Sequence, residues 1–547
     1  MCLRRRSQSR QRIPCHSERS EESPFPAAEV LRCAQNDKES IASTANGDAG
    51  TAYEHDGELG TDRTALLFCV AGFVAAATIS FFILEAIPHV QDSVTYLFQA
   101  NTLALGRLYV EPPALPDFFE QEFMLVHDGK WFGKYPPGFP ILLALGVLVG
   151  QPWLVNPIAA GLSLLVIYLI AKELFNRDVG LLALALGVLS PFFLFLSGSF
   201  MAHSTGLLFA SLFILLFIKT LRRPSWLYPV AAGAAIGMTF LIRPYTAAAI
   251  ALPFVVCAAV VAGKNMRAWG RFSLIILAFA PFLAGYLDYN LLLTGDRFKN
   301  PMELYWSFDR LGFGEGIGMW ETHSPARGLW NTYRNLSELT MHLFGWPNQL
   351  TLAFLFVPFV TLRANRWDFL MLSAFGSLIL AYWAWWAEGI MYGPRYYYEA
   401  LAPILILTTR GILVSREIVA ELWAGRRNAL FAQIPFVLVS ILVFHNVLGF
   451  LPMQVVAHFG YNYVSRQPLR TVEQAEIQNA LVFVDLGQPY EWWNYGSVFF
   501  ANSPTLDGPV VFARDLGSER NQALIAQYPG REYYRLSNNQ LQRLPGK

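Results

Sequence analysis

The chain contains a series of long apolar runs, and these restrict its fold more than any other feature. An α-helix rises 1.5 Å per residue, so about 20 apolar residues cross a hydrocarbon core of ~30 Å. Only 15% of the residues are charged, whereas soluble domains carry about 25%. The sequence therefore predicts a polytopic membrane protein. The runs lie at 64–87, 155–175, 179–198, 203–221, 226–243, 244–263, 271–293, 347–363, 367–387, 393–415 and 429–451.

A further apolar run, 137–150, is too short to be a confident span. We expect it to dip into the membrane, with a full crossing as the alternative. The expected fold is an all-α polytopic membrane bundle of about 11–13 transmembrane helices, followed by a small extramembrane α/β domain.

Basic residues gather in the short connectors between the runs, and they predict the orientation. The connectors at 172–178, 219–226, 263–271, 363–367 and 416–428 are rich in Lys and Arg, which collect on the cytoplasmic side. Loops 88–135 and 294–346 and the C-terminal tail then lie outside. We expect a multi-pass protein of a bacterial inner membrane, with a cytoplasmic N-terminus and a periplasmic tail.

Composition divides the chain into three parts. Residues 1–62 are polar and aperiodic and contain no apolar signal segment, so we expect a disordered extension, with a misassigned start codon as one explanation. Residues 63–452 form the membrane domain. Residues 453–547 form a small domain, in which "ALVFVDL", "GPVVFARDL" and "REYYRL" are typical of strands and "SERNQALIAQY" of a helix. The tail either recognises an acceptor or caps the bundle.

The first outer loop has a pattern of its own. Apolar positions over 92–105 predict a short helix lying on the membrane surface, with Asp92 as its N-cap. The stretch "FMLVHDGKWFGKYPPG" predicts two short strands around an Asp-Gly turn.

Ionisable residues near the predicted membrane ends lie mostly on the outer side. A coupled transporter needs polar groups near the midplane that both sides can reach, whereas this one-sided distribution favours chemistry at the outer leaflet. The residues are Glu85, Asp92, Lys134, His203, Arg243, Asp288, Glu388, Arg395 and Glu399.

These groups suit the transfer of a sugar from a lipid phosphate. A carboxylate must take a proton from the attacking hydroxyl or amine, and Asp92 is the candidate base. The leaving phosphate needs cations, for which Lys134, Arg243 and Arg395 are the candidates. The aromatic run "AYWAWWAEGIMYGPRYYY" offers faces for stacking against a sugar or an interfacial belt.

Each residue also has a purely structural interpretation. Asp92 can serve as a helix cap, Lys134 as a flank that reaches the interface, and His203 as a core residue. Arg395 and Glu399 are four residues apart and can simply pair with each other. Glu120 and Glu122 are either plain loop charges or a second acid or ligand for a divalent metal. No other cofactor and no nucleic-acid partner are indicated, and the five cysteines include no CxxC pair.

The order of four motifs resembles the GT-C glycosyltransferases, in particular the bacterial branch related to protein O-mannosyltransferases and to the aminoarabinose transferase of lipid A. The motifs are "HVQDSVTYLFQA", "GKYPPGFPILLALG", "FLIRPYTAAAIALP" and "YGPRYYYEALAPILIL". The resemblance implies a polyprenyl-phosphate-linked sugar donor, transfer at the outer face to a glycan, lipid or protein acceptor, and inversion of the anomeric centre. It makes Asp92 the catalytic acid of the first loop and places Lys134 and Arg395 at the lipid phosphate. The expected substrate contacts are Tyr96, Tyr135, His203, Asp288, Tyr392, Tyr396 and Glu399.

The sequence departs from the family pattern at two places. Asp92 is followed by Ser93 where many members have a second acid, and Lys134-Tyr135 replaces the His often found before the Pro-Pro element. The acceptor and any metal requirement therefore stay open. A transporter or flippase of lipid-linked glycans is the main alternative, and a structural subunit is the third.

Overall fold

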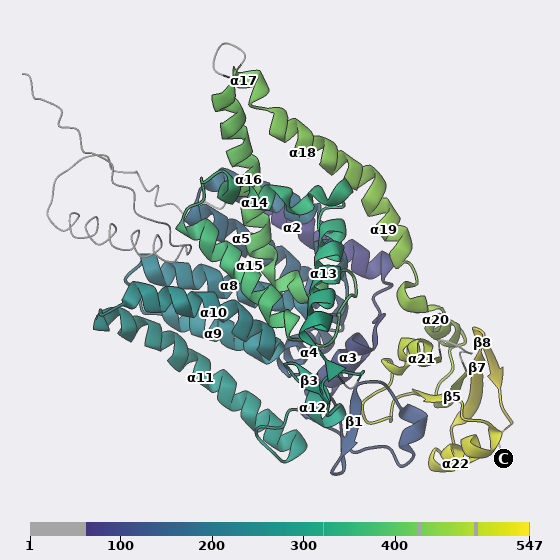
Figure 1. Ribbon diagram of the computed structural model, residues 1–547. Coiled ribbons are helices and arrows are strands. Elements are labelled where there is room, and N and C mark those ends of the chain that lie inside the picture. Colours follow the sequence, from purple (N-terminus) through teal and green to yellow (C-terminus); the bar gives the residue numbers. More distant parts are fainter. Residues whose placement is uncertain (1–61, 321, 424–427, 486–490, 546–547) are drawn as a thin grey trace, which may run out of the picture. The chain divides into compact units, whose positions relative to one another are not determined.

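The computed structural model describes residues 62–545 apart from 321, 424–427 and 486–490 (Figure 1). The extension expected at 1–62 lies outside the described residues except for Asp62. Asp62 is the N-cap of the first helix, where its carboxylate accepts from the backbone N–H of Thr64 and Ala65 and pairs with Arg177 at 2.7 Å. All described residues belong to one compact unit.

The apolar runs are helical and pack as a bundle, which confirms a multi-pass membrane protein. Seven helices among the described residues are long and apolar enough to cross a membrane, or eight if α6 and α7, bent by 62°, count as one span. The bundle helices are α2 Arg63–Thr78, α5 Val155–Leu174, α6 Arg177–Val188, α7 Pro191–Gly198, α8 His203–Arg222, α9 Leu227–Ile242, α10 Pro244–Ala262, α11 Met266–Thr294, α14 Ala353–Val360, α15 Arg366–Trp383, α16 Leu401–Leu422, α18 Ile434–His445 and α19 Leu451–His458.

Three further apolar helices are shorter than a full span, so the predicted number of 11–13 membrane crossings stays a prediction. They are α4 Gly138–Leu148, α9, and the segment Leu350–Val360 that includes α14. The helix α4 covers the 137–150 run, and its 11 residues rise only about 16 Å. That length is about half of a hydrocarbon core, so α4 fits a segment that dips into the membrane.

The start of α4 packs closely against the end of α9. A Cβ atom on Gly138 would lie 2.5 Å from the backbone carbon of Leu241, so no side chain fits at this position. This approach brings the start of α4, just after the first loop, against the end of α9, which Arg243 follows.

The first loop contains the predicted hairpin. Strands β1 Met124–His127 and β2 Lys130–Gly133 pair antiparallel around Asp128 and Gly129. Both turn residues have positive φ, +47° and +70°, as a two-residue type I′ turn requires.

The predicted helix of this loop is α3 Gln91–Ala104, but two expectations about it are wrong. Its N-cap is Val90, and no side chain caps it, so Asp92 lies inside the first turn. Every residue from Gln91 to Ala100 is buried, so α3 does not lie on the membrane surface. Other parts of the protein cover α3, and the tail is one of them. The spacing of apolar residues within the loop gives no sign of this contact with the tail.

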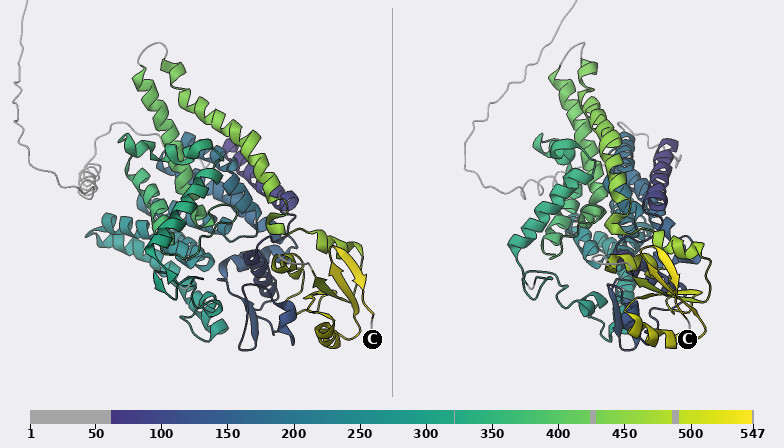
Figure 2. Two further views of the ribbon diagram at one scale, coloured as in Figure 1. Left: turned by 45° about the vertical axis from the view of Figure 1, so that its right-hand side comes forward. Right: turned by 90° about the vertical axis from the view of Figure 1, so that its right-hand side faces the viewer.

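The second long loop, 294–346, crosses the same end of the bundle. It begins with α12 Pro301–Tyr305, forms a two-residue pairing between β3 Gly314–Glu315 and β4 Thr322–His323, and ends in α13 Pro325–His342. In both Figure 1 and Figure 2, α3, β1, α12 and the tail occupy one end of the bundle, and α17 Asn428–Phe431 lies at the other.

The tail folds around a four-stranded sheet in the order β6-β5-β7-β8. The predicted strands are β5 Ala480–Asp485, β6 Val510–Arg514 and β7 Glu532–Ser537, which are parallel. The edge strand β8 Gln540–Arg543 is antiparallel and was not predicted, because it is short and mostly polar. The helices are α20 Gln467–Gln474, α21 Glu491–Phe499 and α22 Ser518–Gln527.

Candidate functional site

A cavity of about 470 Å³ opens between the two long loops, 88–135 and 294–346, and the ends of the bundle helices. It is lined by Asp92, the three candidate cations, and residues of the second long loop. Tyrosine and tryptophan side chains provide much of its wall. A concave site with a few convergent charged groups is the usual form of a ligand pocket. The lining residues used below are Asp92, Tyr96, Phe123, Lys134, Tyr135, Arg243, Tyr245, Glu303, Trp306, Asp309, Arg310, Tyr382, Trp385, Trp386, Arg395 and Tyr396.

Asp92 lies at the pocket with its side chain about 10% exposed. Its Oδ1 atom accepts a hydrogen bond of 3.3 Å from a terminal nitrogen of Arg395. The Nε atom of Arg395 is buried and has no hydrogen-bond partner. Arg395 therefore holds Asp92 through a terminal nitrogen while its buried Nε makes no hydrogen bond.

Lys134 is enclosed by aromatic rings. Its Nζ atom lies 4.0 Å from the ring centre of Phe123 and 4.1 Å from that of Trp306. The carboxylate of Asp309 is 3.8 Å away and also accepts a 2.9 Å hydrogen bond from the indole N–H of Trp386. Burial lowers the pKa of Lys134, and the charge of Asp309 opposes that shift.

A buried network of polar side chains holds Arg243 in place. Its Nε atom lies 3.2 Å from Oε1 of Glu399, and its Nη2 donates a 2.7 Å hydrogen bond to the hydroxyl of Tyr382. Glu399 is fully buried and also contacts His203, whose Nδ1 is 3.0 Å from the same carboxylate oxygen. Glu399 and His203 thus support Arg243 and do not face the pocket themselves.

Aromatic residues form paired faces on the pocket wall. Tyr96 and Tyr135 have ring centres 4.4 Å apart, and Tyr382 stacks on Tyr396 at the same distance. Such faces are suited to the apolar side of a sugar ring.

The structure places the other predicted site residues at different distances from this pocket. Glu122 is partly buried beside it, and burial followed by the charge of Asp92 raises its pKa. Glu120 is exposed and pairs with Arg514 of the tail at 2.5 Å. Asp288 is exposed and pairs with Arg297. Tyr392 is buried in a separate cluster of rings with Tyr461 and His458.

The pocket-lining residues that sequence reasoning did not name include Tyr245, Trp306 and Asp309. The stretch "YWSFDRLGF" contained a signal for Asp309, because an acid among aromatic residues in an outer loop is unusual. Its contact with Lys134 joins two loops far apart in the sequence, which no local pattern reveals.

The three carboxylates that line the pocket are each paired with a cation. Asp92 pairs with Arg395, Asp309 with Lys134, and Glu303 with Arg310. No group of three His, Cys, Asp or Glu residues in the described part of the chain is arranged to hold a metal ion. This donor set does not fit a bound divalent metal.

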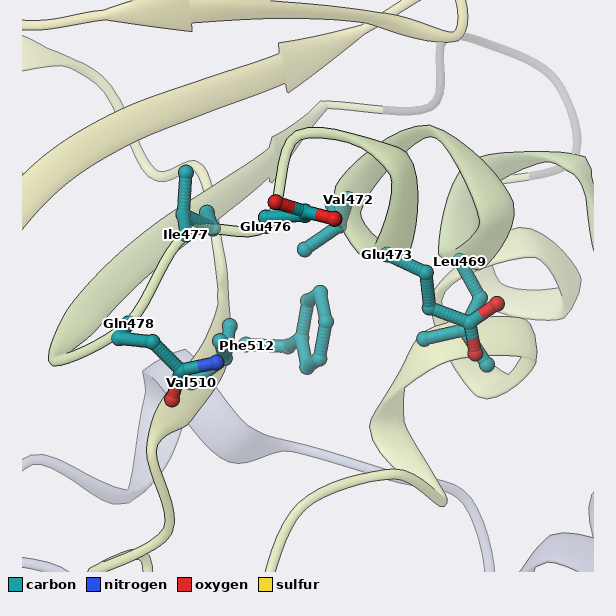
Figure 3. Close-up of a pocket in the computed structure, with 8 residues that line it drawn as sticks. All are labelled: Leu469, Val472, Glu473, Glu476, Ile477, Gln478, Val510 and Phe512. Atoms are coloured by element: carbon teal, nitrogen blue, oxygen red, sulfur yellow. The ribbon is translucent and has the colours of Figure 1, made fainter.

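A second hollow of about 310 Å³ lies on the tail (Figure 3). Its lining comes from α20, the segment after it, and β6, and combines apolar side chains with two glutamates. It has no cation among its lining residues, so it lacks the paired charges found around Asp92. The residues are Leu469, Val472, Glu473, Glu476, Ile477, Gln478, Val510 and Phe512.

Residues 134–285 match a family model described as dolichyl-phosphate-mannose-protein mannosyltransferase. The crystal structure of ArnT from Cupriavidus metallidurans bound to undecaprenyl phosphate is similar over 87% of this chain and 93% of that one, with a TM-score of 0.52 and 13% identity. The chain has the GT-C fold. The apo structure of the same ArnT gives a TM-score of 0.50 at 13% identity, over 86% of this chain and 92% of that one.

The apo oligosaccharyltransferase of Archaeoglobus fulgidus is similar over 87% of this chain and 70% of that one, with a TM-score of 0.45 and 13% identity. Residues 480–543 of the tail match a domain of unknown function. No curated protein matches the chain.

Proposed function

We propose that this protein is an integral-membrane glycosyltransferase that moves a sugar from a polyprenyl-phosphate donor to an acceptor at the outer face of the membrane, with inversion. One observation carries the proposal. Asp92 lies in an aromatic-walled pocket that also contains Lys134, Arg243 and Arg395. A carboxylate beside cations is the set that proton removal and phosphate departure require.

The reaction needs one proton transfer and one displacement. Asp92 takes the proton of an acceptor hydroxyl or amine as its oxygen or nitrogen bonds to the anomeric carbon. The bond from that carbon to the phosphate oxygen breaks, and the electron pair leaves with the polyprenyl phosphate. Arg395, Arg243 and Lys134 stabilise the negative charge of the leaving group. Attack opposite the leaving phosphate inverts the anomeric centre.

The comparisons support the donor class. The matched family is named for mannosyl transfer from a lipid phosphate, and the ArnT structure contains undecaprenyl phosphate. The acceptor is a glycan, a lipid or a protein. No step passes through a metal ion, because the carboxylates that face the pocket are already paired.

A flippase of lipid-linked glycans is the competing function, and proteoliposomes separate the two. The probe is a polyprenyl-phosphate sugar with a fluorescent headgroup, quenched from outside by dithionite. A glycosyltransferase leaves the protected fraction unchanged over time and releases polyprenyl phosphate when an acceptor is added. Loss of protection without release of polyprenyl phosphate would favour the flippase.

Lys134 gives the reaction a pH dependence. Burial lowers its pKa below the ordinary value of 10.5, so it loses its charge, and its hold on phosphate, as pH rises through that lowered value. We expect kcat/KM for the donor to fall on the alkaline side below pH 10.5. In Lys134→Arg the guanidinium stays charged, and this fall moves to higher pH. An identical alkaline limb in the two proteins would contradict the role of Lys134.

A further inference from the structure

We propose that the tail, which includes the domain of unknown function, positions helix α3 and thereby holds Asp92 in the pocket. It is a positioning element of the site, and its activity readout rests on the function proposed above.

The closest of these contacts is at Gly496 in α21. A Cβ atom placed on Gly496 would lie 3.2 Å from Oε1 of Gln91 and 3.2 Å from Cγ2 of Val94. These two α3 residues stand one position before and two positions after Asp92, and both are buried. The backbone of α21 thus packs on the turn of α3 that carries the carboxylate, at a spacing that only glycine permits without a shift.

A shared hydrophobic core extends this contact along α3. Val94 and Phe98 of α3 belong to the same buried cluster as Phe483 and Phe499 of the tail. The rings of Phe98 and Phe499 are stacked with centres 6.1 Å apart. Separation of the tail from α3 would expose this apolar cluster to solvent. Its burial therefore favours one fixed arrangement of the tail and α3.

Polar contacts fix the same arrangement at its edges. Arg514 and Arg520 of the tail pair with Glu120 and Asp117 of the first loop at 2.5 and 2.6 Å. The hydroxyl of Tyr495, next to Gly496, donates to the carbonyl of Phe118. The tail is also tied to the end of the first membrane span. There Glu85 pairs with Arg470 at 3.0 Å.

On the side away from the tail, α3 contributes Asp92 and Tyr96 to the pocket wall. Tyr96 packs with Tyr135 and Phe139. The helix therefore has the tail on one side and the pocket on the other. A displacement of α3 by a fraction of an ångström would move the Asp92 carboxylate relative to Arg395, and misplacement by about 1 Å costs roughly 100-fold in rate.

The test is Gly496→Val in the full-length protein, with Gly508→Val as the matched control. A Cβ on Gly508 meets only atoms at 3.7 Å, which is ordinary van der Waals contact, so this site is less crowded than Gly496. For Gly496→Val we expect a kcat for transfer roughly 10- to 100-fold lower, an unchanged donor KM, and faster hydrogen exchange at the amides of α3. Gly508→Val should match the parent in all three.

A rescue variant separates positioning from misfolding. Val94→Ala removes one of the two clashing groups, so Gly496→Val with Val94→Ala should regain a large part of kcat and of α3 protection. Failure of that rescue would overturn the proposal, as would an unchanged kcat and α3 exchange in Gly496→Val. A rise in acceptor KM alone would also overturn it, in favour of acceptor recognition by the tail. If the parent protein transfers no sugar, the proposed function fails, and the exchange rates of α3 still decide whether the tail holds the helix.

Discussion

Asp92→Asn should abolish sugar transfer while the protein still inserts and folds. The substitution keeps the shape of the side chain and removes the basic oxygen that accepts the proton of the acceptor. A positioned general base contributes about 10²- to 10⁴-fold in rate, so we expect kcat to fall by at least 10²-fold. The measurement is the formation of glycosylated acceptor under saturating donor.

Asp128→Asn is the matched control for this prediction. Asp128 belongs to the same loop and is about 70% exposed at the tip of the hairpin. Its backbone has a positive φ of +47°, a conformation that asparagine tolerates well. We expect parental activity in this variant. Near-parental kcat in Asp92→Asn would remove Asp92 from the mechanism.

Arg395→Ala should cause the second large effect, a lower kcat/KM for the donor. Arg395 lines the pocket and pairs with Asp92 at 3.3 Å, so its removal takes away a candidate phosphate contact and also leaves Asp92 without its partner. Loss of one member of a buried, hydrogen-bonded charge pair costs about 2–5 kcal/mol. We therefore expect kcat/KM for the donor to fall by roughly 30- to 5,000-fold. Arg395→Lys should recover only part of it, because an ammonium cannot donate in the planar, bidentate manner of a guanidinium.

Arg410→Ala controls for the structural cost of breaking a buried ion pair. Arg410 is on α16, which follows directly after the turn that contains Arg395, and pairs with the buried Asp368 at the same 3.3 Å. It does not line the pocket. We expect this variant to melt at a lower temperature with an unchanged donor KM. A loss of Tm without a loss of donor kcat/KM in Arg395→Ala would contradict the phosphate role.

The sequence predicted the features that depend on local pattern. The length of the apolar runs was sufficient for the membrane bundle, and the Asp128-Gly129 pair was sufficient for the hairpin. Three of the four strands of the tail followed from their β-branched and aromatic residues. The site residues themselves stay predictions, although the structure gathers Asp92, Lys134, Arg243 and Arg395 around one cavity.

The sequence did not predict the contacts between distant segments. Nothing local to Glu120 indicates that it pairs with Arg514, and nothing local to α3 indicates that the tail covers it. Glu399 and Arg395 share the spacing of a helical ion pair, yet they turn to different partners, Arg243 and Asp92. Tertiary packing decides these choices, and spacing along a helix cannot distinguish them.

The most direct test of the central claim follows the fate of the donor. Purified protein is incubated with a synthetic undecaprenyl-phosphate sugar of known anomeric configuration and a crude envelope acceptor, and both products are analysed by mass spectrometry and NMR. We expect equal amounts of undecaprenyl phosphate and of a glycosylated acceptor with inverted configuration from the parent protein, and neither product from Asp92→Asn. Retained configuration, or equal product from Asp92→Asn, would contradict direct displacement with Asp92 as the base.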